Sequence, residues 1–162
     1  MQQLSHPFPP LYDNRSRILI LGSFPSVKSR ETAFFYGHPQ NRFWRVLAQL
    51  LDVPVPQTVE EKSALLHAHH IALWDVIASC RIEGSSDSSI RDAAPNDLTP
   101  ILHAAPIRAV FCNGASSYAL YQKHQAKATG LAAVQLPSTS PANAAWSLDR
   151  LTDAWRVILE YL

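Results

Sequence analysis

Residues 17–22, Arg-Ile-Leu-Ile-Leu-Gly, are the stretch that decides the fold. A short run of consecutive apolar residues that ends at glycine is typical of a strand buried on both faces. Similar runs recur at residues 71–75, 107–113 and 131–136, and segments with helical patterns lie between them. Because strands and helices alternate, the sequence predicts an α/β fold: a four-stranded parallel sheet between helices, in a three-layer α/β/α sandwich.

Capping residues mark where the helices should begin. Asn41 can cap a helix that continues to residue 51, and Thr58 with Glu61 forms a capping box for a helix that ends near residue 69. Prolines in residues 1–16, and the many serine and aspartate residues in 83–96, instead predict irregular segments. Further helices are expected to open at Asp97, Gly114 and Ser147.

Composition fits one globular domain that spans residues 1–162. Apolar residues make up 47% of the chain and charged residues 17%, and this length is enough for a substantial core. No apolar run approaches the ~20 residues of a membrane span, and no signal segment begins the chain, so we expect a cytoplasmic protein without membrane contact. Cys80 and Cys112 are expected to be buried thiols; they form no Cys-x-x-Cys pair, which excludes an iron–sulfur cluster or a zinc ribbon.

Charge is unevenly spread along the chain. The whole sequence has a net charge of +1, whereas residues 14–51 carry six basic side chains and one acidic side chain, Glu31. Arginine outnumbers lysine ten to four, and arginine suits bidentate contacts with phosphate. This segment is therefore either a solvated basic face or the binding surface for a polyanion.

The most unusual stretch lies inside this basic segment: residues 36–44, Tyr-Gly-His-Pro-Gln-Asn-Arg-Phe-Trp. Aromatic rings, an amide, an imidazole and a guanidinium come together where a loop becomes a helix, which favours a pocket for a flat heterocycle. In parallel sheets, ligands bind beyond the carboxyl ends of the strands. The four predicted strand exits carry special residues: Gly22, Ser23, Phe24 and Pro25; Asp75; Asn113 and Gly114; and Pro137, Ser138, Thr139 and Ser140.

These motifs resemble the uracil-DNA glycosylase superfamily, and within it the hypoxanthine-DNA glycosylase branch, over about residues 18–155. The resemblance implies a uracil-DNA glycosylase-like fold and an enzyme that removes damaged bases from DNA without a cofactor. We expect a monomer and no metal; the histidines at 67, 69 and 70 lack a carboxylate or cysteine to complete a ligand set. The resemblance rests on Gly-Ser-Phe-Pro-Ser at 22–26, the run at 36–44, Leu-Trp-Asp-Val at 73–76, Phe-Cys-Asn-Gly at 111–114 and Leu-Pro-Ser-Thr-Ser-Pro-Ala at 136–142.

The catalytic role falls on Asn41 through this resemblance. Many members of the superfamily carry an aspartate or asparagine in the first motif, where this chain has Ser23 and Phe24. The hypoxanthine branch instead implies that Asn41 positions the attacking water. An amide is a poor base, so its part would be orientation, helped by the free N–H groups of the helix start. Asn41 could also be only a helix cap, and both roles are compatible.

A flipped base needs a stacking surface and groups that read its edge. Phe24 is the expected stacking surface, unless it is a core residue. His38 could donate to the base or to a phosphate, or be structural. Asp75 could accept the N1–H of hypoxanthine or the N3–H of uracil, or simply tie loops together. Asn113 could read a base edge or bond within its own turn. The predicted base-binding residues are Gly22, Ser23, Phe24, Tyr36, His38, Asp75 and Asn113.

A second set of residues is expected to contact DNA outside the pocket. The resemblance implies that the loop at 137–141 presses into the minor groove, and its hydroxyl and N–H groups suit phosphates; the alternative is an ordinary surface loop. Arg42 and Arg45 are expected to contact flanking phosphates. The full predicted set is Pro25, Ser26, Arg42, Arg45, Ser138, Thr139, Ser140 and Pro141.

The sequence thus predicts a monofunctional DNA glycosylase that hydrolyses the N-glycosidic bond of deaminated bases, hypoxanthine before xanthine or uracil. Nothing marks Lys28, the nearby lysine, as a Schiff-base nucleophile. The alternatives are a uracil or mismatch glycosylase and a non-catalytic module that binds damaged DNA. A nucleotide-binding enzyme is disfavoured because the chain lacks a Gly-x-Gly-x-x-Gly or phosphate-loop motif.

Overall fold

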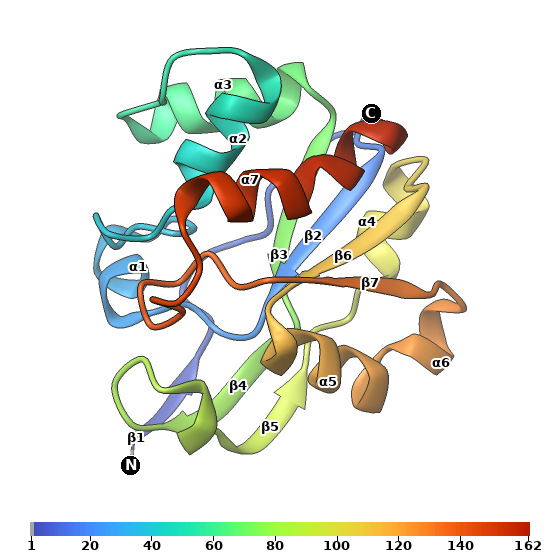
Figure 1. Ribbon diagram of the computed structural model, residues 1–162. Helices are drawn as coiled ribbons and strands as arrows, with labels where there is room; N and C mark the ends of the chain where they lie inside the picture. Colours follow the sequence, from blue (N-terminus) through green and yellow to red (C-terminus); the bar gives the residue numbers. More distant parts are fainter. Residues whose placement is uncertain (1) are drawn as a thin grey trace.

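The computed structural model describes residues 2–162, and a four-stranded parallel sheet lies at its centre (Figure 1). The strand order is β3-β2-β6-β7, and all three pairings are parallel. Every position of β2 and β3 is buried, which explains why both strands are apolar almost throughout. The predicted α/β fold is confirmed. The strands are β2 (Ile18–Gly22), β3 (Ile71–Asp75), β6 (Ala109–Asn113) and β7 (Ala133–Leu136).

Helices flank this sheet; in Figure 1, α7 lies in front of it and α4 behind it. The predicted caps are confirmed at two helices: the Thr58 hydroxyl accepts from the Glu61 N–H, and the Ser147 hydroxyl accepts from the Arg150 N–H. Phe43 is fully buried where α2 packs on α7. The helices are α1 (Val27–Thr32), α2 (Phe43–Leu51), α3 (Val59–Ala68), α4 (Thr99–Ala104), α5 (Ala115–His124), α6 (Ala126–Thr129) and α7 (Leu148–Trp155), with 3-10 turns η1 (Asp87–Ser89) and η2 (Arg156–Tyr161).

A second sheet of three antiparallel strands corrects the sequence prediction. It consists of β1 (Gln2–Ser5), β4 (Ile77–Ile82) and β5 (Arg91–Pro95), in the order β1-β4-β5. The predictions of irregular structure at 1–16 and 83–96 are therefore wrong for β1 and β5. Both strands are mostly exposed, and the pairing of β4 with β5 is interrupted by register shifts. Such strands lack the apolar pattern that identifies a strand in a sequence.

Cys80 and Cys112 are free and buried, as predicted. Burial raises the pKa of the Cys112 thiol to about 12, although a hydrogen bond with Ser117 opposes the shift. Over residues 2–162, no helix is long and apolar enough to cross a membrane. The same residues contain no group of three His, Cys, Asp or Glu side chains placed to hold a metal ion.

Candidate active site

The carboxyl ends of the parallel strands open into a cavity of about 500 Å³, a size common for small-ligand sites, about 300–1,000 Å³. Asn41 and all seven predicted base-binding residues line this cavity, together with six of the eight predicted DNA contacts. Asn41 and Phe24 thus face one space, although they come from different segments. Two predicted DNA contacts, Arg42 and Arg45, lie outside its lining.

Thr139 ties Asn41 to Asn113 at one side of the cavity. Asn41 Oδ1 accepts hydrogen bonds from the Phe43 N–H at 3.0 Å and from the Thr139 hydroxyl at 2.8 Å. The Thr139 hydroxyl accepts from Asn113 Nδ2, and the Thr139 N–H donates to Asn113 Oδ1, both at 3.0 Å. Because a backbone N–H can only donate, Oδ1 of Asn41 must face Phe43. Both lone pairs of Oδ1 are used, so the group that Asn41 offers to a ligand is its NH₂ donor.

This network corrects two interpretations of the sequence. The side chain of Thr139 is fully buried, so its hydroxyl holds two asparagines and does not reach a phosphate. Asn113 bonds across to Thr139, not within its own turn, and keeps one N–H of Nδ2 for a ligand. The N-cap residue of α2 is Arg42, one position later than predicted, but the Asn41 side chain still accepts from the Phe43 N–H, the first N–H of the helix.

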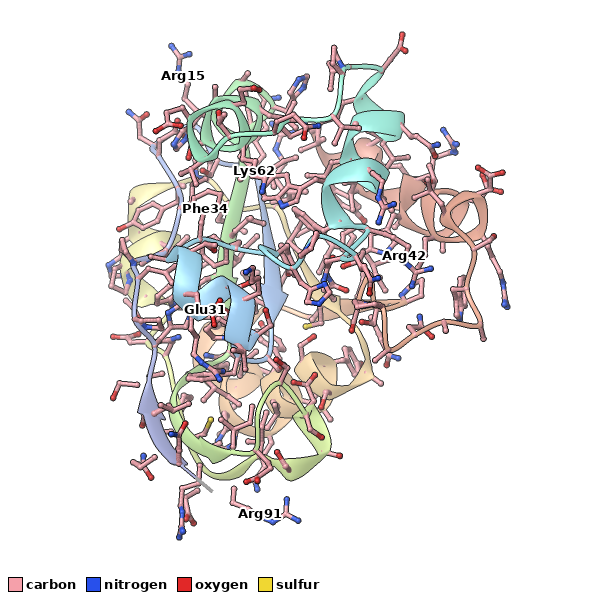
Figure 2. The ribbon with its side chains drawn as sticks, turned by 90° about the vertical axis from the view of Figure 1, so that its left-hand side faces the viewer. Arg15, Glu31, Phe34, Arg42, Lys62 and Arg91 are labelled. Carbon is pink, nitrogen blue, oxygen red and sulfur yellow. The ribbon has the colours of Figure 1, made fainter. Side chains whose placement is uncertain are left out.

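Arg42 organises the loop between β7 and α7, which is a further correction. Its guanidinium donates to the carbonyl oxygens of Ser140 at 3.0 Å and Asn143 at 2.9 Å, and also to that of Trp146. Figure 2 shows Arg42 between α2 and the chain that leads into α7. The predicted phosphate contact of Arg42 is therefore replaced by an internal role. Arg45, by contrast, is exposed on α2.

His6 is the main site residue that the sequence analysis missed. Its Nε2 lies 2.7 Å from Asp75 Oδ2, and the two side chains are only 4% and 6% exposed. Pairing of β1 with β4, and a hydrogen bond from the His6 N–H to the Ala78 carbonyl, bring His6 to this position. No local signal could have identified it, because its partner is 69 residues away.

The other oxygen of Asp75 lies over Gly22, its register partner in β2. A Cβ built on Gly22 would come within 2.4 Å of Asp75 Oδ1 and 3.4 Å of the Tyr36 hydroxyl. Gly22 therefore leaves the space in which the carboxylate oxygen and the phenol approach the same point. Glycine is needed here for close approach, not for its backbone freedom.

Tyr36 combines backbone strain with an unsatisfied hydroxyl. Its φ is 51°, in the left-handed region that residues other than glycine rarely adopt. Its hydroxyl is buried and has no hydrogen-bond partner among residues 2–162. Burial, and then the negative charge of Asp75, raise the pKa of Tyr36 well above its usual value, whereas the nearby amide of Asn113, which makes no hydrogen bond to the hydroxyl in this structure, acts to lower it. The phenol therefore stays neutral, as a donor at the cavity floor.

Residues 85–87 close another side of the cavity, which the sequence analysis also missed. The Ser23 hydroxyl donates to Asp87 Oδ1 at 2.7 Å. Burial raises the pKa of the Asp87 carboxyl and the charge of Asp75 adds to this, whereas donation from Ser23 lowers it. Arg30 donates to the carbonyls of Pro25 and Gly84. These contacts connect the first strand motif to this wall.

Phe24 and His38 have defined surroundings. The Arg30 guanidinium lies 5.8 Å from the centre of the Phe24 ring, and Phe24 is 7% exposed. Phe24 is thus largely a core residue that still lines the cavity. Nδ1 of His38 accepts from the Gln40 N–H at 3.1 Å, which leaves Nε2 to donate into the cavity.

Comparisons with known proteins show the family to which the chain belongs. The chain matches the family described as Uracil DNA glycosylase superfamily over residues 9–161. It is 32% identical to a hypoxanthine DNA glycosylase of Methanosarcina acetivorans over 155 residues, which cover 95% of this chain and 97% of the relative. A hypoxanthine DNA glycosylase of Methanosarcina barkeri is 36% identical over 113 residues, 68% of this chain and 71% of the relative.

A solved structure shares the fold. The solution NMR structure of a candidate uracil DNA glycosylase from Methanosarcina acetivorans superposes with a TM-score of 0.82 at 32% identity, and the match covers 97% of this chain and 96% of the other. Sequence and structure thus lead to one family over nearly the whole chain. The protein belongs to the uracil DNA glycosylase superfamily and is a DNA glycosylase, an enzyme that hydrolyses N-glycosyl bonds.

Proposed function

We propose that this enzyme removes deaminated bases from DNA, with hypoxanthine as its preferred substrate and xanthine and uracil as further substrates. The observation that carries the proposal is the pair of groups at Gly22: the acceptor Asp75 Oδ1 beside the unsatisfied donor of Tyr36. Hypoxanthine presents an N1–H donor next to its O6 acceptor, which complements this pair. Adenine presents an acceptor at N1 and a donor at N6, the reverse pattern. The names of the two Methanosarcina relatives support the same substrate.

The reaction requires a flipped nucleotide with its base in the cavity. Phe24 stacks on the base, and the donor of His38 is available to an acceptor on it. The bond from C1′ to the base nitrogen breaks, its electron pair leaves with the base, and a water oxygen bonds to C1′ and releases a proton. Asn41 holds this water through its NH₂ group and acts by position, because its oxygen is already occupied. No lysine Schiff base is involved.

DNA contacts outside the cavity come from its rim and from α2. Ser26, Ser138, Ser140 and Pro141 line the cavity and are partly exposed, so they can meet the backbone on either side of the flipped nucleotide. Pro25 also lines the cavity but is buried, so it supports the wall instead of contacting DNA. The exposed side chain of Arg45 is placed to meet a flanking phosphate. Because the hydrogen bonds from Arg42 fix the loop at 140–146, this surface is organised before DNA arrives.

An incision assay tests the proposal. Duplexes that contain hypoxanthine, xanthine, uracil, a thymine mismatch or undamaged adenine are incubated with the enzyme, treated with alkali and resolved on a gel. We expect strand breaks at hypoxanthine first and none at adenine. Breaks at uracil or thymine alone would indicate a uracil or mismatch glycosylase. Binding to damaged DNA without any cleavage would indicate a non-catalytic module.

The Asn41→Ala variant separates binding from chemistry in the same assay. We expect cleavage of the hypoxanthine duplex to fall by about 100-fold or more, because the water is no longer held. Binding to that duplex should persist, since the cavity and the outer surface remain. Cleavage at the wild-type rate would exclude Asn41 from catalysis.

A further inference from the structure

The geometry points to His6 as the residue that positions Asp75 for base selection. His6 fixes the carboxylate so that Oδ1 meets the base as an acceptor. This role rests on the proposed function. His6 does not line the cavity, so it acts through Asp75 as a positioning residue.

The hydrogen bonds of His6 fix its tautomer. Nδ1 of His6 accepts from the Phe8 N–H at 3.5 Å, which is a long but directed contact. The proton of a neutral ring is then on Nε2, the nitrogen that lies 2.7 Å from Asp75 Oδ2. Nε2 therefore donates and Oδ2 accepts. With Oδ2 held in this way, Oδ1 is the oxygen of Asp75 that is left to accept from a base.

Packing prevents His6 from turning away. Its ring packs against the rings of Phe8 and Trp74, with centroid distances of 4.6 Å and 4.4 Å. Phe24 and Phe35 lie further out, at 5.9 Å and 6.4 Å. An aromatic enclosure excludes water, and in such surroundings a hydrogen bond to a charged acceptor is stronger than in water. The donor therefore stays on Oδ2, and Oδ1 keeps its place over Gly22.

Selection of the base follows from this fixed acceptor. A base with N–H at the edge that meets Oδ1, such as hypoxanthine, gains a charge-assisted hydrogen bond. Adenine would place the lone pair of N1 against the carboxylate, which leaves a buried acceptor unpaired. Without His6, the carboxylate can rotate and move Oδ1 away from its place over Gly22, so that N1 of adenine no longer faces a fixed acceptor. Loss of His6 should therefore weaken binding of hypoxanthine and relax the exclusion of adenine.

The test measures binding and cleavage separately. Binding uses two duplexes that resist cleavage, with 2′-fluoro-2′-deoxyinosine or 2′-fluoro-2′-deoxyadenosine opposite cytosine; cleavage uses the ordinary hypoxanthine duplex in single-turnover reactions. His6→Phe keeps a ring in the aromatic enclosure but removes both nitrogens. Discrimination is the dissociation constant for the deoxyadenosine duplex divided by that for the deoxyinosine duplex. We expect this ratio to fall by about 10- to 100-fold, and the cleavage rate of the hypoxanthine duplex to fall by a similar factor. His6→Gln, whose amide can donate to Oδ2, should recover most of both.

The control variant is His103→Phe, because His103 is an exposed histidine in α4. This variant should leave both the ratio of dissociation constants and the cleavage rate unchanged. A double variant, His6→Phe with Asp75→Asn, should be no worse than Asp75→Asn alone, since His6 acts through Asp75.

An unchanged ratio in folded His6→Phe, or additive losses in the double variant, would overturn the role of His6 while wild-type cleavage of hypoxanthine still stands. If His6→Phe does not fold, His6→Gln alone decides: loss of discrimination equal to that of Asp75→Asn would overturn the proposal. A wild-type enzyme that does not cleave hypoxanthine would reject the proposed function itself.

Discussion

At the scale of single residues, the site depends on a glycine that leaves space and on an asparagine whose oxygen already accepts two hydrogen bonds. Gly22 leaves room for Asp75 Oδ1, and the oxygen of Asn41 is used by two donors. Residue types at the strand exits could be predicted to meet, because parallel strands end at one edge. Their hydrogen-bond states could not, since these depend on partners such as Thr139 that are distant in the sequence.

Gly22→Ala should strongly reduce activity with little change in fold. Its Cβ would come within 2.4 Å of Asp75 Oδ1, so the carboxylate must move, and we expect hypoxanthine cleavage to fall by about 100-fold. Single-turnover rates and thermal unfolding measure the two effects. Gly130→Ala is the comparison: it meets no atom within 4 Å but has a φ of +69°, so it should cost stability and leave the rate unchanged. Wild-type cleavage by Gly22→Ala would show that Asp75 does not need this position.

Thr139→Val should affect both stability and catalysis. Valine keeps the shape of threonine but removes the hydroxyl that bonds Asn41 and Asn113. We expect a loss of about 1–3 kcal/mol in the free energy of unfolding, because buried polar groups lose their partner. Asn41 also loses one of the two hydrogen bonds that hold its oxygen, so the cleavage rate should drop. Denaturant unfolding and single-turnover kinetics measure this; a variant equal to wild type in both would remove Thr139 from the network.

At the scale of elements, the parallel sheet was predictable and the small antiparallel sheet was not. The buried strands β2 and β3 are recognisable in the sequence as apolar runs, whereas β1 and β5 are mostly exposed and lack such a pattern. β1 nevertheless carries the chain to His6, directly behind Asp75. The missed element and the missed residue therefore have one cause: long-range strand pairing leaves no local pattern in a polar segment.

Arg42 and Arg45, three residues apart at the start of α2, should behave differently. Arg42→Met removes charge-assisted bonds to three loop carbonyls, so we expect a loss of about 1.5–3 kcal/mol in stability and faster hydrogen exchange in residues 140–146. Arg45→Met should leave stability unchanged but reduce the salt dependence of DNA binding by about one phosphate contact. The reverse pattern would contradict these assignments.

At the scale of the whole molecule, one buried core supports the site. Cys80 and Cys112 belong to this core, each fully buried, and composition correctly predicted two buried thiols. The basic segment at 14–51 was harder to interpret from sequence. Charge alone does not say which side chains face solvent. Arg42 in this segment donates to loop carbonyls inside the protein.

The thiols should report opening of the whole core. Burial raises the pKa of both, to about 12 for Cys112, so at pH 8 both are uncharged and shielded. We expect no reaction with an aromatic disulfide reagent in the native state, and two equivalents after denaturation. Rapid modification of either thiol in the folded enzyme would indicate a core that opens locally.

The central claim is that the cavity recognises the N–H of a deaminated base with Asp75 Oδ1. The most direct measurement compares single-turnover cleavage of two duplexes that differ by one methyl group, with hypoxanthine or 1-methylhypoxanthine opposite the same base. Methylation removes the donor and places carbon against the carboxylate, so we expect cleavage to fall by about 100-fold or more. Equal rates on the two duplexes would contradict the claim.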